Sequence, residues 1–295
     1  MTAFTKRSME GKVVLITGAT RGIGRRAAQE IATTGATLIV VGRSNKRTAR
    51  LVAELHTVPG ARSIDGEICN LMLQSEVRNL ADRVRTKHGR LDVLINNAGA
   101  IFSQRELTSE GFERTWALNH NAYFLLTTLL QDLLVERSPA RVVNTASDAH
   151  QTGRMYWDDL QFSKHQPLWG WRSYSQSKLA NVLFTRQLAH YLKGSKVTAN
   201  AVHPGFVNTG FSHNNGPLAR AMMVLTRPVQ RRDSKGAETV VWAAISEEAE
   251  GITGEYLYDC KPKEPSKRAK DMAAAARLWA LSEDMTATRG DWDCH

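Results

Sequence analysis

A tyrosine and a lysine four residues apart, Tyr174 and Lys178, are the side chains of this sequence best suited to acid–base chemistry. Apolar residues at helical spacing predict a helix from Gln176 to Leu192, and in a helix a residue and its fourth successor lie on one face. A phenol has an ordinary pKa of about 10, so it exchanges protons poorly at neutral pH unless a nearby cation stabilises its phenolate. Lys178 can supply that cation. The pair alone is also typical of an ordinary amphipathic face, and only the rest of the chain favours the chemical interpretation.

The first apolar run leads into a glycine-rich turn. Residues Lys12 to Thr17 are mostly β-branched and apolar, as expected of a buried parallel strand. Gly18, Gly22 and Gly24 follow with the spacing G-x-x-x-G-x-G, and a helix is predicted from Arg25 to Thr34. Glycines allow a tight turn and a close approach to a diphosphate, whose charge can lie at the helix N-terminus. Ordinary turns also hold several glycines, but the position between strand and helix favours dinucleotide binding.

The end of the second predicted strand, Gly35 to Arg43, should reach the adenosine ribose of a bound dinucleotide. An acidic residue there would bind the ribose hydroxyls and repel a phosphate, but this position holds Arg43 followed by Ser44. Together with Arg21 and Arg47, they offer charge-assisted donors to a 2′-phosphate. The sequence therefore favours NADP over NAD. Arg47 could instead be an exposed charge at the start of a helix.

Predicted strands and helices alternate along the rest of the chain. Further strands, with the turns that follow them, are predicted at 62–67, 91–99, 141–147, 200–209 and 251–257, and helices at 46–56, 80–87, 115–135 and 271–281. This alternation predicts a single Rossmann-type, doubly wound parallel sheet of about seven strands with helices on both faces. We find no internal repeat or linker, so residues 1–295 are expected to form one α/β domain.

Polar residues follow two of the predicted strands. Asn96 to Gly99 end the fourth strand with amides and a glycine, and Ser147 ends the fifth. Ligands of parallel α/β sheets bind at this carboxyl edge, where the Ser147 hydroxyl can donate to a substrate carbonyl. Taken alone, such a serine more often caps or turns the chain, and Asn-Gly-rich strand ends are common in plain turns.

The order of these motifs carries more weight than any one of them. Along the chain they are Thr17 to Gly24, Asn96 to Gly99, Asn119, Ser147, Tyr174 with Lys178, and Pro204-Gly205. Together they resemble the short-chain dehydrogenase/reductase family over nearly the whole chain. Within that family, the stretches 117–127, 174–181 and 201–205 are similar to the retinol dehydrogenase-like branch with its protochlorophyllide reductase relatives.

The resemblance implies a mechanism without a metal. Tyr174 would protonate the carbonyl oxygen during reduction while hydride passes from the nicotinamide to carbon, and its phenolate would remove the alcohol proton during oxidation. Lys178 would favour the phenolate and hold the nicotinamide ribose. Ser147 would donate to the carbonyl, and Asn119, in the predicted helix 115–135, would hold a water that links Lys178 to solvent. An asparagine inside a helix could otherwise be a simple packing defect.

The resemblance also implies how NADP(H) is held. The expected contacts are Gly18, Thr20, Arg21, Gly22, Ile23, Gly24, Arg43, Ser44, Asn70, Leu71, Asn97, Ala98, Gly99, Tyr174, Lys178, Pro204, Gly205, Val207 and Thr209. Relatives commonly have an aspartate in place of Asn70, but an amide oxygen can still accept a hydrogen bond from adenine. Relatives also often carry two serines where this chain has Ala146-Ser147. We assign His203 no catalytic role, because the motif already supplies an acid–base group.

Two segments flank the predicted site, near 148–173 and 210–232, and they contain many aromatic residues and methionines. Such side chains make an adaptable apolar wall that suits a lipophilic alcohol, aldehyde or ketone. They could equally belong to the core or to a subunit contact. We expect an oxidoreductase that interconverts a lipophilic alcohol and its carbonyl compound by hydride transfer.

Two other functions stay open. One is reduction of an activated carbon–carbon double bond, as in the protochlorophyllide reductase relatives. The other is a sensor or scaffold that binds NADPH without turnover, although intact Ser147, Tyr174 and Lys178 argue against it. Related proteins often pair through the helices that carry Asn119 and Tyr174, and both a monomer and a homodimer are compatible with the sequence.

Composition sets the remaining limits. The formal net charge of +10 favours an anionic ligand such as a phosphate, but no motif that reads nucleic acid accompanies it. Cys69, Cys260 and Cys294 form no disulfide framework or metal-ligand spacing, which favours a reducing, cytoplasmic location. No signal pattern and no apolar run of roughly 18 residues are found, so a transmembrane anchor is not expected.

Overall fold

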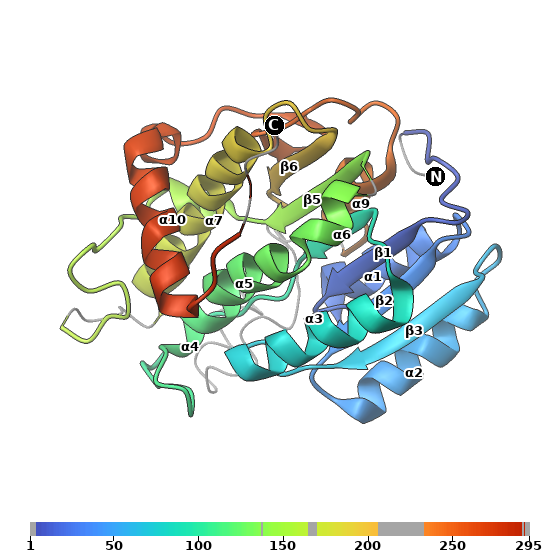
Figure 1. The fold of residues 1–295 in the computed structure, drawn as a ribbon, viewed down its shortest axis with the longest axis horizontal. Coiled ribbons are helices and arrows are strands. Elements are labelled where there is room, and N and C mark those ends of the chain that lie inside the picture. Colours follow the sequence, from blue (N-terminus) through green and yellow to red (C-terminus); the bar gives the residue numbers. More distant parts are fainter. Residues whose placement is uncertain (1–3, 137, 165–169, 206–232, 291, 293–295) are drawn as a thin grey trace, which may run out of the picture.

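One mixed sheet organises the chain from Val13 to Pro262. A computed structural model describes residues 4–136, 138–164, 170–205, 233–290 and 292. The strand order is β3-β2-β1-β4-β5-β6-β7-β8 (Figure 1). The strands are β1 (Val13–Thr17), β2 (Thr37–Gly42), β3 (Ser63–Ile68), β4 (Val93–Asn96), β5 (Ala140–Thr145), β6 (Val197–Val202), β7 (Tyr256–Tyr258) and β8 (Lys261–Pro262).

The predicted Rossmann-type α/β class is confirmed, and the strand count needs correction. About seven strands were expected from the alternation of elements; the sheet has eight, because the short β8 pairs antiparallel with β7. Both β8 residues are exposed, so no apolar pattern marked this strand. The other neighbouring strands are parallel, and strand order reverses between β1 and β4. Ligands of open α/β sheets bind outside the carboxyl ends of strands at such a reversal.

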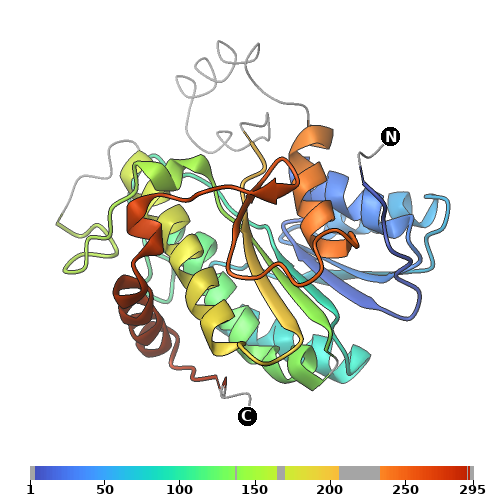
Figure 2. The same ribbon diagram turned by 90° about the horizontal axis from the view of Figure 1, so that it is seen from above.

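Helices cover both faces of the sheet (Figure 2). One layer holds α1 (Gly22–Ala32), α2 (Asn45–His56) and α9 (Asp233–Ile245), and the other holds α3 (Gln74–His88), α5 (Ala122–Leu129) and α7 (Trp171–Tyr191). Alternate side chains of one strand enter opposite cores: Val14 and Ile16 pack toward the first layer, Val13 and Leu15 toward the second. This two-sided burial explains the continuous apolar runs that predicted buried strands.

The helix predicted at 115–135 is interrupted. It is divided into α4 (Arg114–Trp116), a π-helical segment at Ala117–Asn121, α5, and α6 (Gln131–Glu136). The buried Glu113 caps its start by accepting hydrogen bonds from the amides of Thr115 and Trp116. Apolar periodicity predicts helix but does not distinguish α from π hydrogen bonding, so the interruption was missed.

The C-terminal helix α10 (Met272–Thr286) lies beside α7 in both views (Figures 1 and 2). Short 3₁₀ segments, Asp148–Gln151 and Lys267–Lys270, precede α7 and α10 in the chain. No helix in the described ranges has the length and apolar character required to cross a bilayer.

Candidate active site

The glycine-rich turn after β1 is shaped for close backbone contact. Gly18 and Gly22 have positive φ angles of 66° and 49°. A Cβ atom on Gly24 would lie 2.4 Å from the Gly18 carbonyl oxygen, so a larger residue would force the turn apart. Because α1 begins at Gly22, its N-terminus faces this turn. Thr20, Arg21 and Ile23 complete the turn, and the backbone amides at the start of a helix are suited to a diphosphate.

The turn is tied to the end of β4. The Thr17 hydroxyl accepts hydrogen bonds from the amides of Asn97 (2.9 Å) and Ala98 (3.1 Å). The Asn97 side chain donates to the carbonyl of Thr17 at 2.9 Å. The structure therefore brings the two predicted nucleotide motifs together at the reversal of strand order. Sequence reasoning included Thr17 in the motif but missed its role as the link.

Positively charged side chains surround the predicted ribose position. Arg43 directly follows β2, and Ser44 occupies the cap position before α2. Arg21 occupies the corresponding position before α1. Arg21 and Arg43 are exposed, and neither forms an ion pair with another residue in the described part of the chain. Their donors remain available to an anion.

Asn70 and Leu71 form a turn after β3. The Asn70 amide donates to Glu76 Oε2 at 2.6 Å, and its side-chain oxygen accepts from the Met72 amide at 3.4 Å. Leu71 is buried. The turn places an amide group near the edge where adenine was expected, but part of its hydrogen-bonding capacity is used locally.

Ser147, Tyr174 and Lys178 meet at the carboxyl end of β5. Tyr174 and Lys178 extend from α7, and Lys178 Nζ lies 5.7 Å from the Tyr174 ring centroid. Lys178 is only 2% exposed and donates to the carbonyl of Thr145 at 2.8 Å. The Ser147 hydroxyl accepts from the Ala149 amide at 3.2 Å. The same-face prediction for Tyr174 and Lys178 is met by this geometry.

Burial controls proton affinity at both α7 side chains. It raises the pKa of Tyr174 to about 12, while hydrogen bonding with Ser147 acts in the opposite direction. Burial lowers the pKa of Lys178 to about 7. The dominant influence on Tyr174 is thus loss of water contact rather than the lysine charge invoked from the sequence. Tyr174 is a protonated phenol in this environment.

Asn119 lies in the π-helical segment and is fully buried. Its side-chain oxygen accepts from the Ala100 amide at 3.0 Å, and its nitrogen donates to the Ala100 carbonyl and to the Ser177 hydroxyl. A Cβ atom on Gly99 would lie 3.3 Å from the Asn119 oxygen and 3.5 Å from Lys178 Nζ. Asn119 thus connects the loop after β4 to α7, rather than being an unpaired polar residue in a helix.

The remaining predicted site residues are placed only in part. Pro204 and Gly205 follow β6, and the Gly205 amide donates to Nδ1 of His203 at 3.3 Å. Val207, Thr209 and the segment 210–232 lie outside the described residues.

The segment near 148–173 is partly described and is fastened to α7. The Gln176 side chain accepts from the Tyr156 amide and donates to the Leu160 carbonyl, both at 2.8 Å. Trp171 is 46% exposed, with its ring centroid 6.2 Å from that of Tyr174. Some of the aromatic residues in this segment therefore belong to the core, as Phe162 does, while Trp171 lies open beside the site.

The sheet order and the position of Ser147, Tyr174 and Lys178 define a Rossmann-type α/β protein with a polar site at the carboxyl edge of its sheet. A family model for the short chain dehydrogenases matches residues 12–218, and the chain belongs to that family. It is similar to retinol dehydrogenase 12 of Mus musculus, with 38% identity over 278 residues, 94% of this chain and 87% of the relative. The retinol dehydrogenase-like resemblance is confirmed, and the protein is an oxidoreductase of the type that acts on alcohols and carbonyls.

Solved structures support the same assignment. An uncharacterized protein from Mycobacterium Paratuberculosis is 34% identical, with a TM-score of 0.79 and 98% of each chain covered. A short chain dehydrogenase from Burkholderia cenocepacia was solved with NADP (28% identity, TM-score 0.66, 85% of this chain and 96% of the other). A 3-ketoacyl-(acyl-carrier-protein) reductase from Brucella melitensis was solved with NADH (25%, 0.66, 85% and 97%). Both nicotinamide dinucleotides therefore occur among similar structures.

Proposed function

We propose that this protein is an NADP-dependent oxidoreductase that interconverts a lipophilic alcohol and its aldehyde or ketone, with residues 1–295 acting as one domain. The observation that carries the proposal is the meeting of Ser147, Tyr174 and Lys178 at the carboxyl end of β5. This edge adjoins the glycine-rich turn, where a bound dinucleotide would place its reactive end near the same side chains.

Each side chain has a defined task in the proposed reaction. Ser147 donates to the substrate carbonyl oxygen and orients it. Tyr174 transfers its phenolic proton to that oxygen as negative charge develops, which agrees with the raised pKa that keeps the phenol protonated. Lys178 then stabilises the resulting phenolate, and Asn119 keeps the loop after β4 against α7. The nicotinamide, when bound, supplies the hydride.

Preference for NADP rests on Arg43, with contributions from Arg21 and Ser44. Their donors face solvent at the end of β2 and the start of α1, and a 2′-phosphate would pair with guanidinium groups through charge-assisted hydrogen bonds. A carboxylate at this place would instead select NAD.

The substrate is proposed to be apolar near its reacting carbon. Trp171 exposes a large aromatic surface next to Tyr174, so an aliphatic or aromatic group could pack against it while the carbonyl reaches Ser147. The retinol dehydrogenase relatives agree with a lipophilic substrate.

The deciding experiment measures NADPH oxidation by the purified protein with a panel of hydrophobic aldehydes and ketones, with NADH in parallel. We expect turnover with NADPH, and a loss of at least about 1,000-fold in kcat for Tyr174→Phe with NADPH affinity largely kept. Tyr191→Phe, in the last turn of α7, is the matched control and should remain active. Near-normal turnover by Tyr174→Phe would refute the proton-transfer assignment. Identification of products separates carbonyl reduction from reduction of a double bond.

A further inference from the structure

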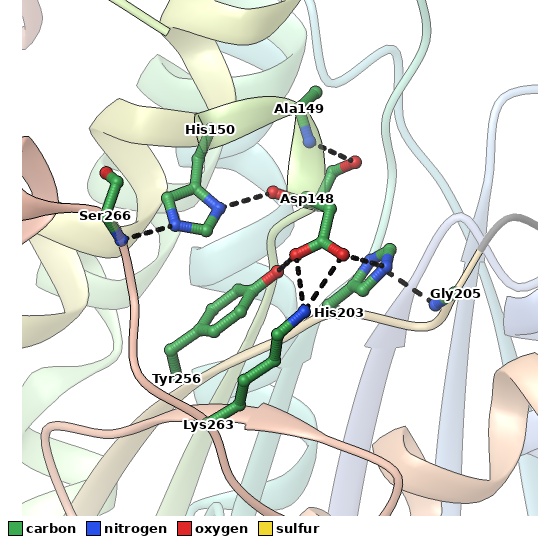
Figure 3. A network of polar contacts seen from close by, with 9 residues as sticks. Asp148, Ala149, His150, His203, Gly205, Tyr256, Lys263 and Ser266 are labelled. Atoms are coloured by element: carbon green, nitrogen blue, oxygen red, sulfur yellow. Dashed lines mark hydrogen bonds and ion pairs between the residues drawn. The ribbon is translucent and has the colours of Figure 1, made fainter. Parts of the chain in front are cut away.

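The residue after Ser147 is the centre of a polar network that the proposed reaction does not use (Figure 3). Asp148 Oδ1 accepts from the Tyr256 hydroxyl at 2.8 Å and from Lys263 Nζ at 3.1 Å. Asp148 Oδ2 contacts the same ammonium at 3.1 Å and Nε2 of His203 at 3.3 Å. These donors come from the residue after β6, from β7 and from the residue after β8. One carboxylate therefore joins three parts of the chain to the turn that carries Ser147.

The hydrogen bonds of His203 fix its tautomer. Its Nδ1 accepts from the Gly205 amide, so this nitrogen carries no proton and the ring proton lies on Nε2. Nε2 then donates to Asp148, and the ring stacks on Tyr258 with a centroid distance of 5.1 Å. The result is a directed chain from the Gly205 amide through His203 to Asp148.

A second histidine holds the other side of the turn. His150 Nε2 accepts from the Ser266 amide at 3.1 Å, so its proton lies on Nδ1, which donates to the Ser147 carbonyl at 2.8 Å. Burial lowers the pKa of His150, in agreement with a neutral ring. The backbone of Ser147 is therefore held in two ways. Its carbonyl oxygen accepts a hydrogen bond from His150, and the next residue, Asp148, is bound to the sheet.

We infer that Asp148 is a positioning residue for Ser147, and that Asp148 and His203 together couple the serine-bearing turn to the loop at Gly205. The inference rests on the proposed function, because it gives Ser147 the role of substrate donor. The turn Asp148–Gln151 is a single short 3₁₀ segment, and its few local hydrogen bonds have the weaker geometry of that helix type. The carboxylate adds bonds to the sheet beside these local ones, so the direction of the Ser147 hydroxyl depends also on these distant donors.

Asp148→Asn tests the link with little change in shape. Whichever way the amide is turned, its NH₂ group faces a donor, Lys263 or His203, so at least one contact becomes repulsive. Hydrogen exchange of the backbone should become at least about 10-fold faster at Ala149 and His150, while the strands β1 to β3 keep their protection. Unchanged exchange in the turn would overturn the inference, whatever the enzyme's activity.

Asp65→Asn is the matched control. Asp65 also pairs with a lysine and a histidine, Lys87 at 2.7 Å and His88 at 3.4 Å. It lies in β3, however, which is the edge strand at the other end of the sheet from β8. The control should leave exchange in the turn and the rate of turnover within about twofold of the wild-type values. An equal effect of both variants would mean general loosening of the fold and would count against the inference.

Kinetics then test whether Asp148 acts through Ser147. Asp148→Asn should lower kcat by about 10-fold or more with a smaller change in the KM for NADPH. In a double-mutant cycle, Asp148→Asn added to Ser147→Ala should cause no further loss beyond about twofold, since the group being positioned is gone. If the double variant instead lost kcat by the product of the two single losses, Asp148 would act independently of Ser147, and the inference would be refuted. If the wild-type protein reduces no carbonyl, the proposed function fails, while hydrogen exchange still decides the structural link.

Two substitutions at His203 separate its hydrogen bond to Asp148 from its hydrogen bond with the Gly205 amide. His203→Gln can keep a donor to Asp148 but loses the acceptor for Gly205, whereas His203→Asn can keep the acceptor but loses the donor. We expect faster exchange of the Ala149 amide in His203→Asn than in His203→Gln, by about threefold or more. Equal exchange rates would refute the role of His203 in the coupling.

Discussion

The protonation state of Lys178 should control stability in the protein without cofactor. Burial lowers its pKa from 10.5 to about 7. Between these values the unfolded chain binds the lysine proton and the folded chain does not, so the free energy of unfolding rises with pH, by at most about 1.4 kcal/mol per pH unit. Below about pH 7 both states are protonated and the full penalty for a buried charge remains.

Lys178→Met should remove that penalty, because methionine fills similar space without charge. We expect the variant to be more stable than the wild type at pH 6, with the advantage shrinking as the pH rises to 9. Denaturant titrations of both proteins at each pH measure the difference. Lys46→Met, at an exposed position in α2, should show no such trend. A difference between wild type and Lys178→Met that is the same at both pH values would contradict the prediction.

Arg43 should set the choice of dinucleotide. Arg43→Asp replaces a donor by a carboxylate that repels a 2′-phosphate and can accept from ribose hydroxyls. We expect the ratio of the Kd values for NADPH and NADH to shift toward NADH by about 100-fold. Fluorescence titration with each dinucleotide measures this ratio. Arg50→Asp, which makes the same charge change at an exposed position of α2, should leave it nearly constant, and an unchanged ratio in Arg43→Asp would refute the role of Arg43.

At the scale of elements, α10 packs one large aromatic side chain against α5 and α7. Trp279 is 4% exposed, and its ring centroid lies 5.0 Å from Phe124 of α5 and 4.9 Å from Tyr191 of α7. Trp279→Ala should lower the free energy of unfolding by roughly 3–5 kcal/mol, which corresponds to a fall in Tm of roughly 10 °C. Met272→Ala, at a 37% exposed position of the same helix, should change stability by less than about 0.5 kcal/mol. Equal Tm values for the two variants would contradict this account.

Elements with strong local patterns were predictable, and those set by distant contacts were not. Apolar runs located β1 and β2, and helical spacing located α2, whose C-terminal residue His56 matches the predicted end. The start of α3 at Gln74 was missed because its first turn is polar and is capped by Glu110, which accepts from the amides of Gln74 and Ser75. A cap supplied from so far along the chain leaves no local signal.

The same distinction applies to the site. Glycine spacing, the Tyr174–Lys178 interval and the strand-end Ser147 are local features, so sequence and family resemblance were sufficient to nominate them. The acceptor of the Lys178 ammonium is a backbone carbonyl, that of Thr145, which no residue type reveals. Asp148 was missed because its partners are far away in the sequence, and only the folded sheet brings them together.

For the whole molecule, the position of α10 bears on assembly. Its contacts with α7 and the insertion of Trp279 between α5 and α7 cover part of the face through which two chains would pair by these helices. We expect a monomer of 32.8 kDa by light scattering after size-exclusion chromatography. A stable species of twice that mass would contradict the prediction, and comparison with Trp279→Ala would show whether α10 takes part in that contact.

The Asp148 network also has a consequence for how the chain is made. Its donors Tyr256 and Lys263 lie 108 and 115 residues after Asp148. At a translation rate of about 5–20 residues per second, roughly 5 to 25 seconds separate the synthesis of the serine-bearing turn from that of its partners. A nascent chain can therefore contain every residue of the glycine-rich turn and of the Ser147, Tyr174 and Lys178 set while the serine still lacks its supports. Chains stalled or cut before Tyr256 would hold all of these site residues but lack two of the three donors to Asp148.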